Sequence, residues 1–297
     1  MARQCLICLC LVLIASGAAS SGNASNAAAA QAPSAAANYE TRKITDSVYI
    51  FRFGGTQAMF VVTPDGVIAT DPISPQASKV YLQEIRKITQ APVRYVVYSH
   101  HHLDHVAGGA PFKAAGATFV AHRQARAALV GLNHPEVVIP DLVVDDQTVL
   151  TIGGTRVELH FVGKNHTDNS LVTYVPKDRI IFAVDFLLIK ELPFRSLPDT
   201  YVLEYVESID RTLALDWDRM IAGHSRQDGI GTKDDIRAFK GYMSDLFAAV
   251  KQAAAEGKCE ARAMTEIKLP QYADWGRQEF LPQNIERLCY FFRLGWL

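Results

Sequence analysis

The sequence predicts an α/β protein in which two β-sheets pack face to face and helices cover their outer faces. Strand-like segments fall into two groups along the chain, and in each group strands are followed by an alternation of strand and helix. Hydrophobic residues make up 49% of the 297 residues, which leaves ample material for a buried core. We therefore expect four layers in the order helix, sheet, sheet, helix.

The first group opens with a predicted β-hairpin, because two segments rich in Val, Ile, Tyr and Phe are separated by Gly54 and Gly55. Apolar residues then recur at helical spacing, and a nearly continuous apolar run after them predicts a strand buried between layers. The expected strands span residues 44–53, 56–63, 67–71 and 93–98; a helix is expected over 75–89, and another begins over 107–115.

The second group begins with four β-rich segments and continues with two helices that flank a short strand. Its expected strands span residues 148–152, 155–162, 170–175, 179–184 and 219–222, and its helices span 201–213 and 233–255. The tail from residue 262, which contains Tyr272, Trp275 and Trp296, is expected to pack back on the body as an irregular segment and a final helix.

The N-terminus has the features of a signal peptide over residues 1–20. Arg3 precedes an apolar run at residues 5–15, and small residues follow as far as Ser20, near which we expect cleavage. The run is shorter than the roughly 20 apolar residues that a membrane span needs. We therefore expect an exported protein, periplasmic or secreted, without stable membrane insertion after cleavage; an uncleaved signal anchor is the alternative.

The remaining chain is expected to form a flexible linker, a body and an extension. Residues 21–42 are assigned to the linker because most of them are Ala, Ser, Asn, Gly, Gln or Pro, which bury little apolar area. The body spans 43–256, and a helical extension at 257–297 packs on it. Cys259 and Cys289 are the cysteines outside the signal, and spacing leaves open whether they form a disulfide or stay separate thiols.

The charge balance excludes one class of partner. Thirty basic and 31 acidic residues give a net charge of -1, without the basic excess that binding to a phosphate backbone requires. We expect a small-molecule substrate and no nucleic acid.

A cluster of imidazoles and a carboxylate follows the predicted strand at 93–98. Four of the nine histidines fall within six residues, at His100, His101, His102 and His105, with Asp104 among them. Ligands of α/β sheets commonly bind at the carboxyl ends of strands. In a tight turn, His100 and His102 can converge on one point while Asp104 and His105 face a second point close by. These side chains are ligands that zinc accepts.

Further candidate ligands stand at strand boundaries in the second group. His166 precedes the strand at 170–175, and His224 follows the strand at 219–222. Asp185 stands at the end of the apolar run at 180–184. A solvated polar turn or a surface histidine patch does not account for this recurrence. The sequence therefore predicts a metal site assembled from several loops.

In this order, His100-x-His102-x-Asp104-His105, His166-Thr167, Asp185 and Gly223-His224 resemble the metallo-β-lactamase superfamily over roughly residues 43–256. The resemblance implies a four-layer αββα sandwich that binds two zinc ions per chain. It assigns one ion to His100, His102 and His166 and the other to Asp104, His105 and His224, with Asp185 bridging the two. It also implies that Asp71 hydrogen-bonds the ligand turn; a turn-forming role before Pro72 is the alternative.

The implied reaction is hydrolysis. A metal-bridging hydroxide would attack the carbonyl of an ester, thioester, lactone or β-lactam, and Asp104 would be the catalytic residue that orients it. Superfamily members with two irons and redox activity carry a glutamate at the position of His102, which favours hydrolysis here. His101 is expected at the rim of the site, and His122, His134 and His160 are interpreted as ordinary histidines. The alternatives are a single-iron sulfur dioxygenase acting on persulfides and a non-catalytic periplasmic carrier of metal or ligand.

The residues that follow Asp185 do not identify the substrate. Zinc lactamases of the commonest subclass have a cysteine in place of Asp185 and a lysine three residues later, where this chain has Leu188. Lys190 could substitute for that lysine or be a solvated side chain. The hairpin at Gly54 could be a mobile flap and the segment 186–200 a wall of the pocket; a plain turn and a plain connector are the alternatives.

Overall fold

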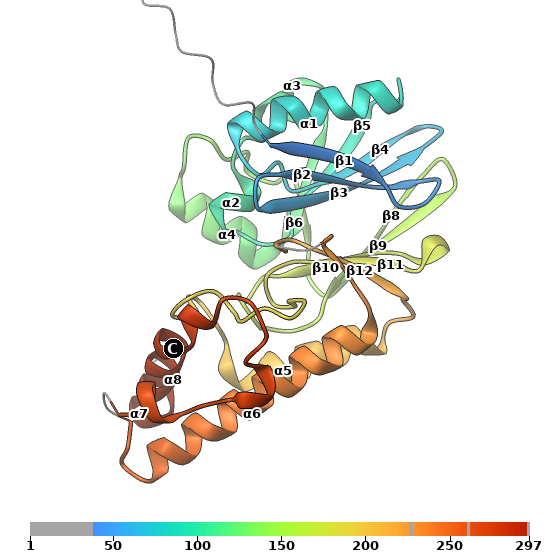
Figure 1. The fold of residues 1–297 in the computed structure, drawn as a ribbon. Coiled ribbons are helices and arrows are strands. Elements are labelled where there is room, and N and C mark those ends of the chain that lie inside the picture. Colours follow the sequence, from blue (N-terminus) through green and yellow to red (C-terminus); the bar gives the residue numbers. More distant parts are fainter. Residues whose placement is uncertain (1–37, 226–227, 260–261, 296–297) are drawn as a thin grey trace, which may run out of the picture. The chain divides into compact units, whose positions relative to one another are not determined.

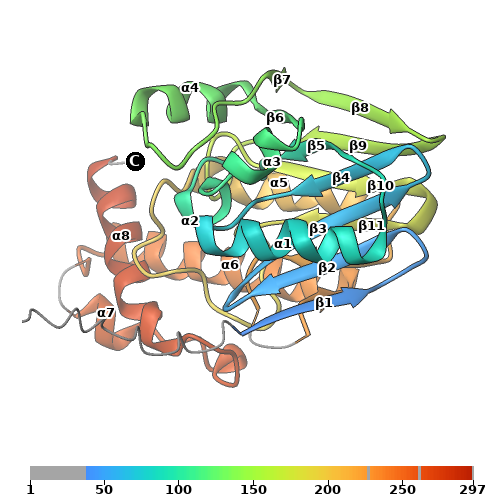
Figure 2. The ribbon, with the colours of Figure 1, turned by 90° about the horizontal axis from the view of Figure 1, so that it is seen from above.

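The structure is a computed structural model that describes residues 38–225, 228–259 and 262–295. These described residues form one compact unit by their internal contacts. Two sheets pack face to face with helices on their outer sides (Figures 1 and 2), as the sequence predicts. The expected signal peptide, most of the expected linker and Trp296 lie outside the described residues.

The first sheet has seven strands in sequential order. They are β1 (Tyr39–Lys43), β2 (Val48–Phe53), β3 (Thr56–Thr63), β4 (Gly66–Thr70), β5 (Val93–Val97), β6 (Thr118–His122) and β7 (Leu142–Val144). Strands β1 to β4 pair antiparallel, and β4 to β7 pair parallel. The predicted hairpin is β2–β3, and Gly54 turns it at a φ of 59°, which glycine adopts without steric cost.

The linker assignment is wrong at its end. Residues 39–42 belong to β1, which pairs in register with β2 from Tyr39 opposite Phe53 to Lys43 opposite Tyr49. The rings of Tyr39 and Phe51 also lie 6.4 Å apart. Backbone pairing and this aromatic contact order a segment whose composition alone is typical of a linker.

The second sheet has six strands in the order β13-β12-β11-β10-β9-β8. They are β8 (Gln147–Ile152), β9 (Thr155–Phe161), β10 (Leu171–Val175), β11 (Ile180–Ala183), β12 (Arg219–Ala222) and β13 (Ile230–Gly231). The β11–β12 pair is parallel and the other pairs are antiparallel.

Three long helices cover the outer faces of the sheets. Helix α1 (Pro75–Ile88) lies over the first sheet, and α5 (Val202–Ala214) and α6 (Lys233–Ala255) lie under the second (Figure 1). The Ser74 hydroxyl accepts a hydrogen bond from the Ala77 amide and caps α1, and Thr232 and Asp235 form a capping box at the start of α6. Short helices α2 (Leu103–Val106), α3 (Ala110–Ala114) and α4 (Arg123–Leu132) and the 3-10 turn η1 (Pro176–Asp178) complete this part.

Of the helix expected over residues 107–115, only Ala110–Ala114 is helical, as α3; α2 ends at Val106, before Gly108. Gly108 has a φ of 86°, outside the helical region, and a Cβ there would lie 2.3 Å from the carbonyl carbon of Ser74. The chain breaks the helix at this glycine because its backbone passes directly against the start of α1.

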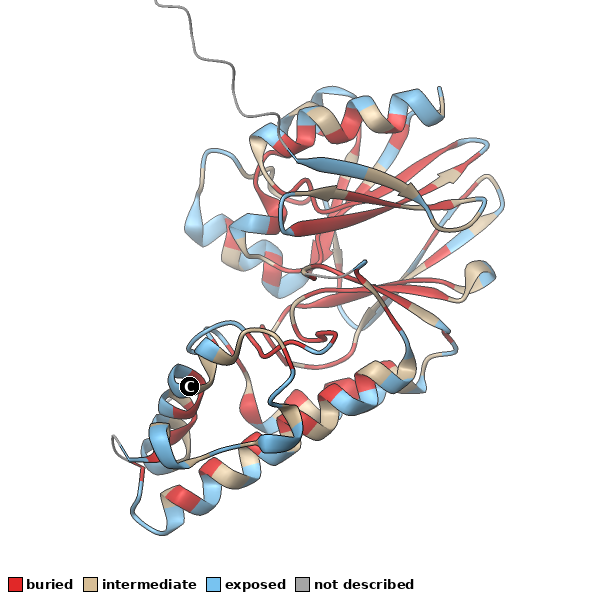
Figure 3. Ribbon diagram, in the orientation of Figure 1, coloured by how far each residue is buried: buried red, intermediate tan, exposed pale blue. Residues whose placement is uncertain are grey.

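The core consists of three buried layers (Figure 3). Aliphatic side chains such as Ile50, Met59 and Leu159 fill the space between the two sheets. Aromatic rings contact one another beneath α1, where Phe51 stacks on Tyr81 with ring centroids 4.4 Å apart. The third layer lies between the second sheet and its helices, and the C-terminal segment contributes to it.

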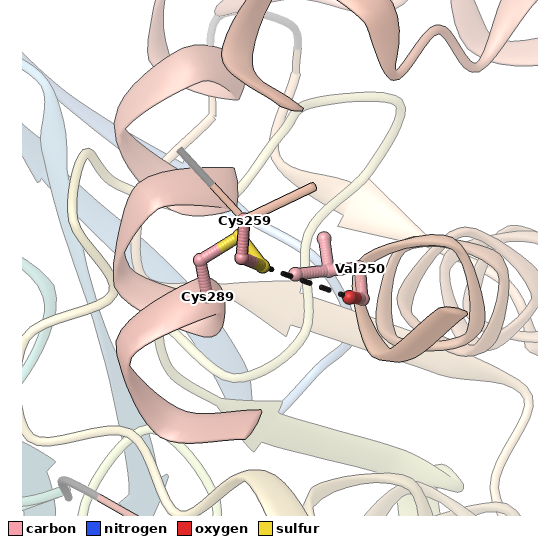
Figure 4. The surroundings of a disulfide bond; sticks show 3 residues. All are labelled: Val250, Cys259 and Cys289. Atoms are coloured by element: carbon pink, nitrogen blue, oxygen red, sulfur yellow. Dashed lines mark hydrogen bonds between the residues drawn. A yellow bond between two sulfur atoms is a disulfide. The ribbon is translucent and has the colours of Figure 1, made fainter. Parts of the chain in front are cut away.

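The C-terminal segment packs on α6 through its last helix. It contains α7 (Ala263–Glu266), η2 (Pro270–Tyr272), η3 (Gln278–Phe280) and α8 (Leu281–Leu294). Cys259 and Cys289 form a disulfide that joins the chain just after α6 to α8, beside Val250 (Figure 4). Of the two readings that spacing left open, the structure has the disulfide. Among the described helices, none combines the length and the apolar composition that crossing a membrane would take.

Candidate metal centre

The histidine-rich turn lies between the end of β5 and helix α2, and Asp71 at the end of β4 holds it. The amide of Ser99 donates a hydrogen bond to Asp71 Oδ1 at 2.8 Å, and the amide of Ile73 donates to the carbonyl of His105 at 2.9 Å. Asp71 is completely buried. The two adjacent parallel strands thereby fix the backbone from which the candidate ligands project.

The first ligand group consists of His100, His102, His166 and Asp185, whose ligand atoms all lie within 4.8 Å of one another. His166 Nε2 is 3.1 Å from His102 Nδ1. Asp185 Oδ2 is 3.5 Å from His100 Nε2 and 3.6 Å from His166 Nε2. His166 comes from the loop between β9 and β10, and Asp185 follows β11.

The second ligand group consists of Asp104, His105, His224 and again Asp185. His224 Nε2 lies 3.1 Å from both Asp104 Oδ2 and His105 Nε2, and 3.5 Å from Asp185 Oδ1. Asp185 Oδ2 is 3.4 Å from His105 Nε2. The structure therefore brings all seven residues singled out in the sequence together, with Asp185 shared by the two groups.

The outer nitrogens of three rings are fixed by acceptors. His105 Nδ1 donates to Asp71 Oδ2 at 3.1 Å, His224 Nδ1 donates to the Gly55 carbonyl at 3.0 Å, and His102 Nε2 donates to Asp199 Oδ2 at 2.9 Å. Carboxylates and carbonyls only accept, so each neutral ring carries its proton on the outer nitrogen. The inner nitrogen of each ring then presents a lone pair to the site.

A bound cation fits this arrangement better than the protein alone does. The inner Nε2 atoms of His105 and His224 are 3.1 Å apart, so a proton or a metal ion must lie between their lone pairs. Among the described residues, His100 Nε2 and Asp185 Oδ1 are buried without a hydrogen-bond partner. Unpaired buried polar atoms are costly, and a metal ion would satisfy them. Imidazole and carboxylate donors without thiolate suit ions such as zinc, iron or nickel.

The protonation states follow from burial and mutual charge. Burial lowers the pKa of His100 well below its ordinary value and lowers the pKa of His166 to about 4. Burial opposes the charge of Asp104, but the hydrogen bond from His224 and the proximity of His105 lower its pKa to about 2. Burial also opposes a proton on His105, yet Asp185 and Asp71 raise its pKa well above the ordinary value. In the metal-free protein His105 therefore holds a proton, which a bound cation would displace.

The remaining sequence candidates lie around the two groups. Asp71 contacts the ligand turn, as expected. His101 belongs to neither group: its Nδ1 lies 2.9 Å from the side-chain nitrogen of Asn169. His122 and His160 lie elsewhere, stacked on Phe161 and paired with Glu158. Of His134 the structure shows only a local contact, in which its Nδ1 accepts from the Glu136 amide at 3.3 Å.

Asp199 is a contact of the site that the sequence did not reveal. It fixes His102 from the segment between β11 and α5, and its Oδ2 also lies 3.7 Å from His101 Nε2. Its position after Pro198 carries no ligand pattern, so its proximity to His102 depends on the tertiary path of the segment.

A cavity of about 600 Å³ opens over the candidate ligands. Its lining combines five of them with four apolar side chains and one arginine: His102, Asp104, His166, Asp185, His224, Leu103, Leu188, Phe194, Pro198 and Arg277. The segment 186–200 therefore forms a wall, as one of its two readings predicted. Lys190 is exposed and does not line the cavity, whereas Leu188 is buried in its wall.

The hairpin tip is attached to the His224 loop. Besides the Gly55 contact with His224, the amide of Gln57 donates to the carbonyl of Gly223 at 2.7 Å. Gly54 and Gly55 are absent from the described lining of the cavity. This position supports a role in fixing His224 rather than in covering a substrate.

Comparison with known proteins agrees with this architecture. The family model described as "Metallo-beta-lactamase superfamily" matches residues 51–224. The solved structure of a metallo-beta-lactamase from Pontibacter korlensis superposes with a TM-score of 0.61 at 20% identity, covering 70% of this chain and 99% of that one. At this identity the likeness shows the fold alone.

Two curated relatives have different names. The chain is 24% identical over 188 residues to the 2,4-dinitroanisole O-demethylase subunit alpha of Nocardioides sp. (strain JS1661), which covers 62% of this chain and 57% of that protein. It is 26% identical over 179 residues to a metallo-beta-lactamase type 2 of Elizabethkingia meningoseptica, covering 56% and 70%. The match to the demethylase subunit thus spans little more than half of that protein's length.

Proposed function

The chain belongs to the metallo-β-lactamase superfamily, and from this premise we propose that it is an exported zinc-dependent hydrolase of a small ester, thioester, lactone or β-lactam. The observation that carries the proposal is the pair of nitrogen and oxygen donor groups that share Asp185 at the floor of one cavity. A complete donor set in contact with a substrate-sized space is what metal-assisted hydrolysis requires.

We assign one zinc ion to each group. His100, His102 and His166 would hold the first, Asp104, His105 and His224 the second, and Asp185 would contact both. Bound zinc lowers the pKa of water from 15.7 to about 7 and thereby supplies a hydroxide nucleophile at neutral pH.

Asp104 is the proposed catalytic residue. Its carboxylate lines the cavity, where one oxygen would bind the second ion and the other could accept a hydrogen bond from water. From this position it can orient the attacking water toward a substrate. Leu103, Leu188 and Phe194 can bind the apolar part of that substrate and exclude other water from it.

Export and a small-molecule partner remain part of the proposal. The Cys259–Cys289 disulfide supports export, because disulfides persist mainly in oxidising compartments. The near balance of acidic and basic residues gives no support to nucleic-acid binding. Mass spectrometry of the mature protein would test cleavage near Ser20.

A second candidate reaction is cleavage of an aryl methyl ether. The name of the Nocardioides relative describes O-demethylation of 2,4-dinitroanisole, and the apolar walls around Phe194 suit an aromatic ring. This compound therefore belongs in the substrate panel.

The test combines metal analysis with turnover. Protein purified without added metal should contain about two zinc ions per chain. It should hydrolyse at least one member of a panel of p-nitrophenyl esters, a thioester, a lactone, nitrocefin and 2,4-dinitroanisole. His102→Ala should lose metal and activity, whereas His134→Ala, outside both ligand groups, should retain them.

Other outcomes would replace this function. One iron per chain with oxygen uptake on a persulfide would identify a sulfur dioxygenase. Tight metal binding without turnover of any panel member would favour a carrier. Absence of bound transition metal and indifference to chelators would contradict both the hydrolase and these alternatives.

A further inference from the structure

The C-terminal segment contributes a cation to the wall of the metal-site cavity. Arg277 lines the cavity that also contains Asp104, His166 and Asp185. Among the described lining residues, it carries the only permanent positive charge. It lies outside the region that the family model matches, so the superfamily resemblance does not assign it a role.

Arg277 is held in place from two sides. The amide of Gly276 donates to the Lys190 carbonyl at 2.8 Å, and the amide of Leu192 donates to the Gly276 carbonyl at 3.0 Å. These bonds join the backbone before Arg277 to the wall segment 186–200. Arg277 Nε lies 2.8 Å from Glu191 Oε2, and the two side chains are 17% and 5% exposed.

This anchoring leaves most of the guanidinium available. Among the described residues, Glu191 is the only carboxylate paired with Arg277, and the contact is through Nε. The two terminal nitrogens carry four further N–H donors, in the planar geometry that binds a carboxylate through two parallel hydrogen bonds. Because Glu191 already orders the side chain, binding a carboxylate would cost little additional conformational entropy.

We propose that Arg277 is a specificity-determining residue that binds a carboxylate of the substrate while the scissile bond lies at the metal centre. The substrate would be a small anion in which an apolar spacer, in contact with Leu188 and Phe194, separates the carboxylate from an ester, thioester, lactone or lactam. A cavity of about 600 Å³ accommodates a molecule of this size. The choice of scissile bond rests on the proposed function, whereas the carboxylate preference is measurable by binding alone.

The binding test compares adipate with hexanoate, which differ by the distal carboxylate. Calorimetry on the zinc-loaded full chain should show adipate binding about tenfold more tightly. Arg277→Met should abolish this difference, because it keeps the apolar stem and removes the guanidinium. Lys190→Met is the matched control: it removes an exposed positive charge from the adjoining wall segment and should leave the preference intact.

Equal affinities of the two ligands for the unsubstituted protein would overturn the proposal, as would an adipate preference that survives in Arg277→Met. Because Arg277→Met removes the guanidinium beside the buried Glu191 carboxylate, Arg277→Met/Glu191→Gln provides a second variant without that negative charge. It should lose the preference in the same way. Arg277→Lys, which retains the charge but not the planar fork, should keep part of it.

A turnover test separates this inference from the proposed function. Mono-p-nitrophenyl adipate and p-nitrophenyl hexanoate share the scissile ester and differ in the carboxylate. Arg277→Met should raise KM about tenfold for the adipate ester alone and leave kcat unchanged. Equal losses for both esters would indicate a structural role and contradict the inference. Failure of the protein to hydrolyse any ester would contradict the hydrolase assignment, while the adipate binding preference would still report on Arg277.

Discussion

The orientation of His105 depends on Asp71, a residue from a neighbouring strand. Asp71 is buried and receives two hydrogen bonds, one from the Ser99 amide and one from His105 Nδ1. One carboxylate thus fixes both the backbone before the ligand turn and the tautomer of a ligand inside it. Such contacts behind a ligand strongly affect metal affinity.

Asp71→Asn should therefore weaken metal binding without removing a ligand. The amide has one acceptor oxygen, so either the Ser99 amide or His105 Nδ1 would face an NH₂ group instead of an acceptor. We expect metal affinity to fall about 10–100-fold, measured by competition with a chromophoric chelator. Asp46→Asn, at an exposed aspartate paired with Lys43, is the control. Unchanged affinity in Asp71→Asn would assign Asp71 to the turn alone.

At the scale of residues, the sequence locates the candidate ligands but not the side chains that support them. The candidate ligands stand beside strands in a spaced pattern, as a metal site built from strand ends would require. Asp199 and Arg277 reach the site through irregular segments with no periodicity, so their partners follow only from the tertiary path. The interpretation of Lys190 as a carboxylate-binding residue illustrates this: it is close in sequence to Asp185, yet it does not line the cavity.

At the scale of elements, helix α4 begins with an uncommon cap. His122 ends β6, and its Nδ1 accepts a hydrogen bond from the Gln124 amide at 3.3 Å. Its ring stacks on Phe161 with centroids 4.3 Å apart. Burial lowers the pKa of His122, although Asp168 and Asp145 partly oppose this shift. The neutral ring is thus the capping form.

This cap should make α4 sensitive to acid. Because the folded-state pKa of His122 is depressed, the unfolded chain binds the proton more readily, and stability is lost as pH falls through the unfolded value of about 6.5. His122→Asn keeps a capping acceptor that does not titrate. Between about pH 8 and pH 5.5, the unprotonated cap's contribution of about 1 kcal/mol should decline in the original protein relative to the variant.

Urea unfolding of zinc-loaded proteins at both pH values measures this difference, and hydrogen exchange of the α4 amides localises it. Comparison with His122→Asn cancels the titration of the metal ligands, which both proteins share. An identical stability difference at the two pH values would show that the His122 contact does not cap the helix.

Elements with strong periodicity are predicted well, and the failures occur where contacts between segments decide the structure. Helix α6 has the predicted bounds, and β2, β3, β8 and β9 were located within a few residues. The break at Gly108 depends on a contact with Ser74, and the pairing of β1 depends on an exposed edge of β2, so neither is visible in a window of sequence. No elements were predicted for β6, α4, β7 and β13.

At the scale of the molecule, the candidate metal centre lies where loops of both sheets meet. The ligand turn follows β5 of the first sheet, whereas His166, Asp185 and His224 come from loops of the second. An ion in either ligand group would be held by residues from both sheets and would therefore cross-link them. An ion that binds only the folded chain stabilises it by mass action.

Metal removal should therefore lower the stability of the whole unit rather than of one loop. At a free zinc concentration of 100 times Kd, the expected gain in unfolding free energy is about 2.7 kcal/mol per site. Thermal unfolding with zinc and after dialysis against a chelator measures it, and His102→Ala should respond less than His134→Ala. A melting temperature that does not respond to zinc in the unsubstituted protein would contradict metal binding at these residues.

The disulfide is expected to affect both the stability of the whole molecule and the part of the C-terminal segment that carries Arg277. It closes a loop with a sequence separation of 30 residues, and α8, to which it is bonded, follows Arg277 and η3 directly. By loop-closure entropy, Cys259→Ser/Cys289→Ser should lower the free energy of unfolding by about 3.6 kcal/mol. Without the disulfide, α8 would be less firmly attached to the end of α6. The segment around Arg277, which precedes α8, should then become more mobile, and the adipate preference should fall.

Urea unfolding and adipate binding, each measured with and without a thiol reductant, test both consequences. In the original protein, the reductant should reproduce the effect of the double substitution. The double variant has no disulfide to reduce, so an effect of the reductant on it would indicate damage to the metal site instead. Equal unfolding free energies of the two proteins would contradict a stabilising disulfide. A loss of stability with an unchanged adipate preference would show instead that the Arg277–Glu191 pair and the bonds of Gly276 hold the wall without help from α8.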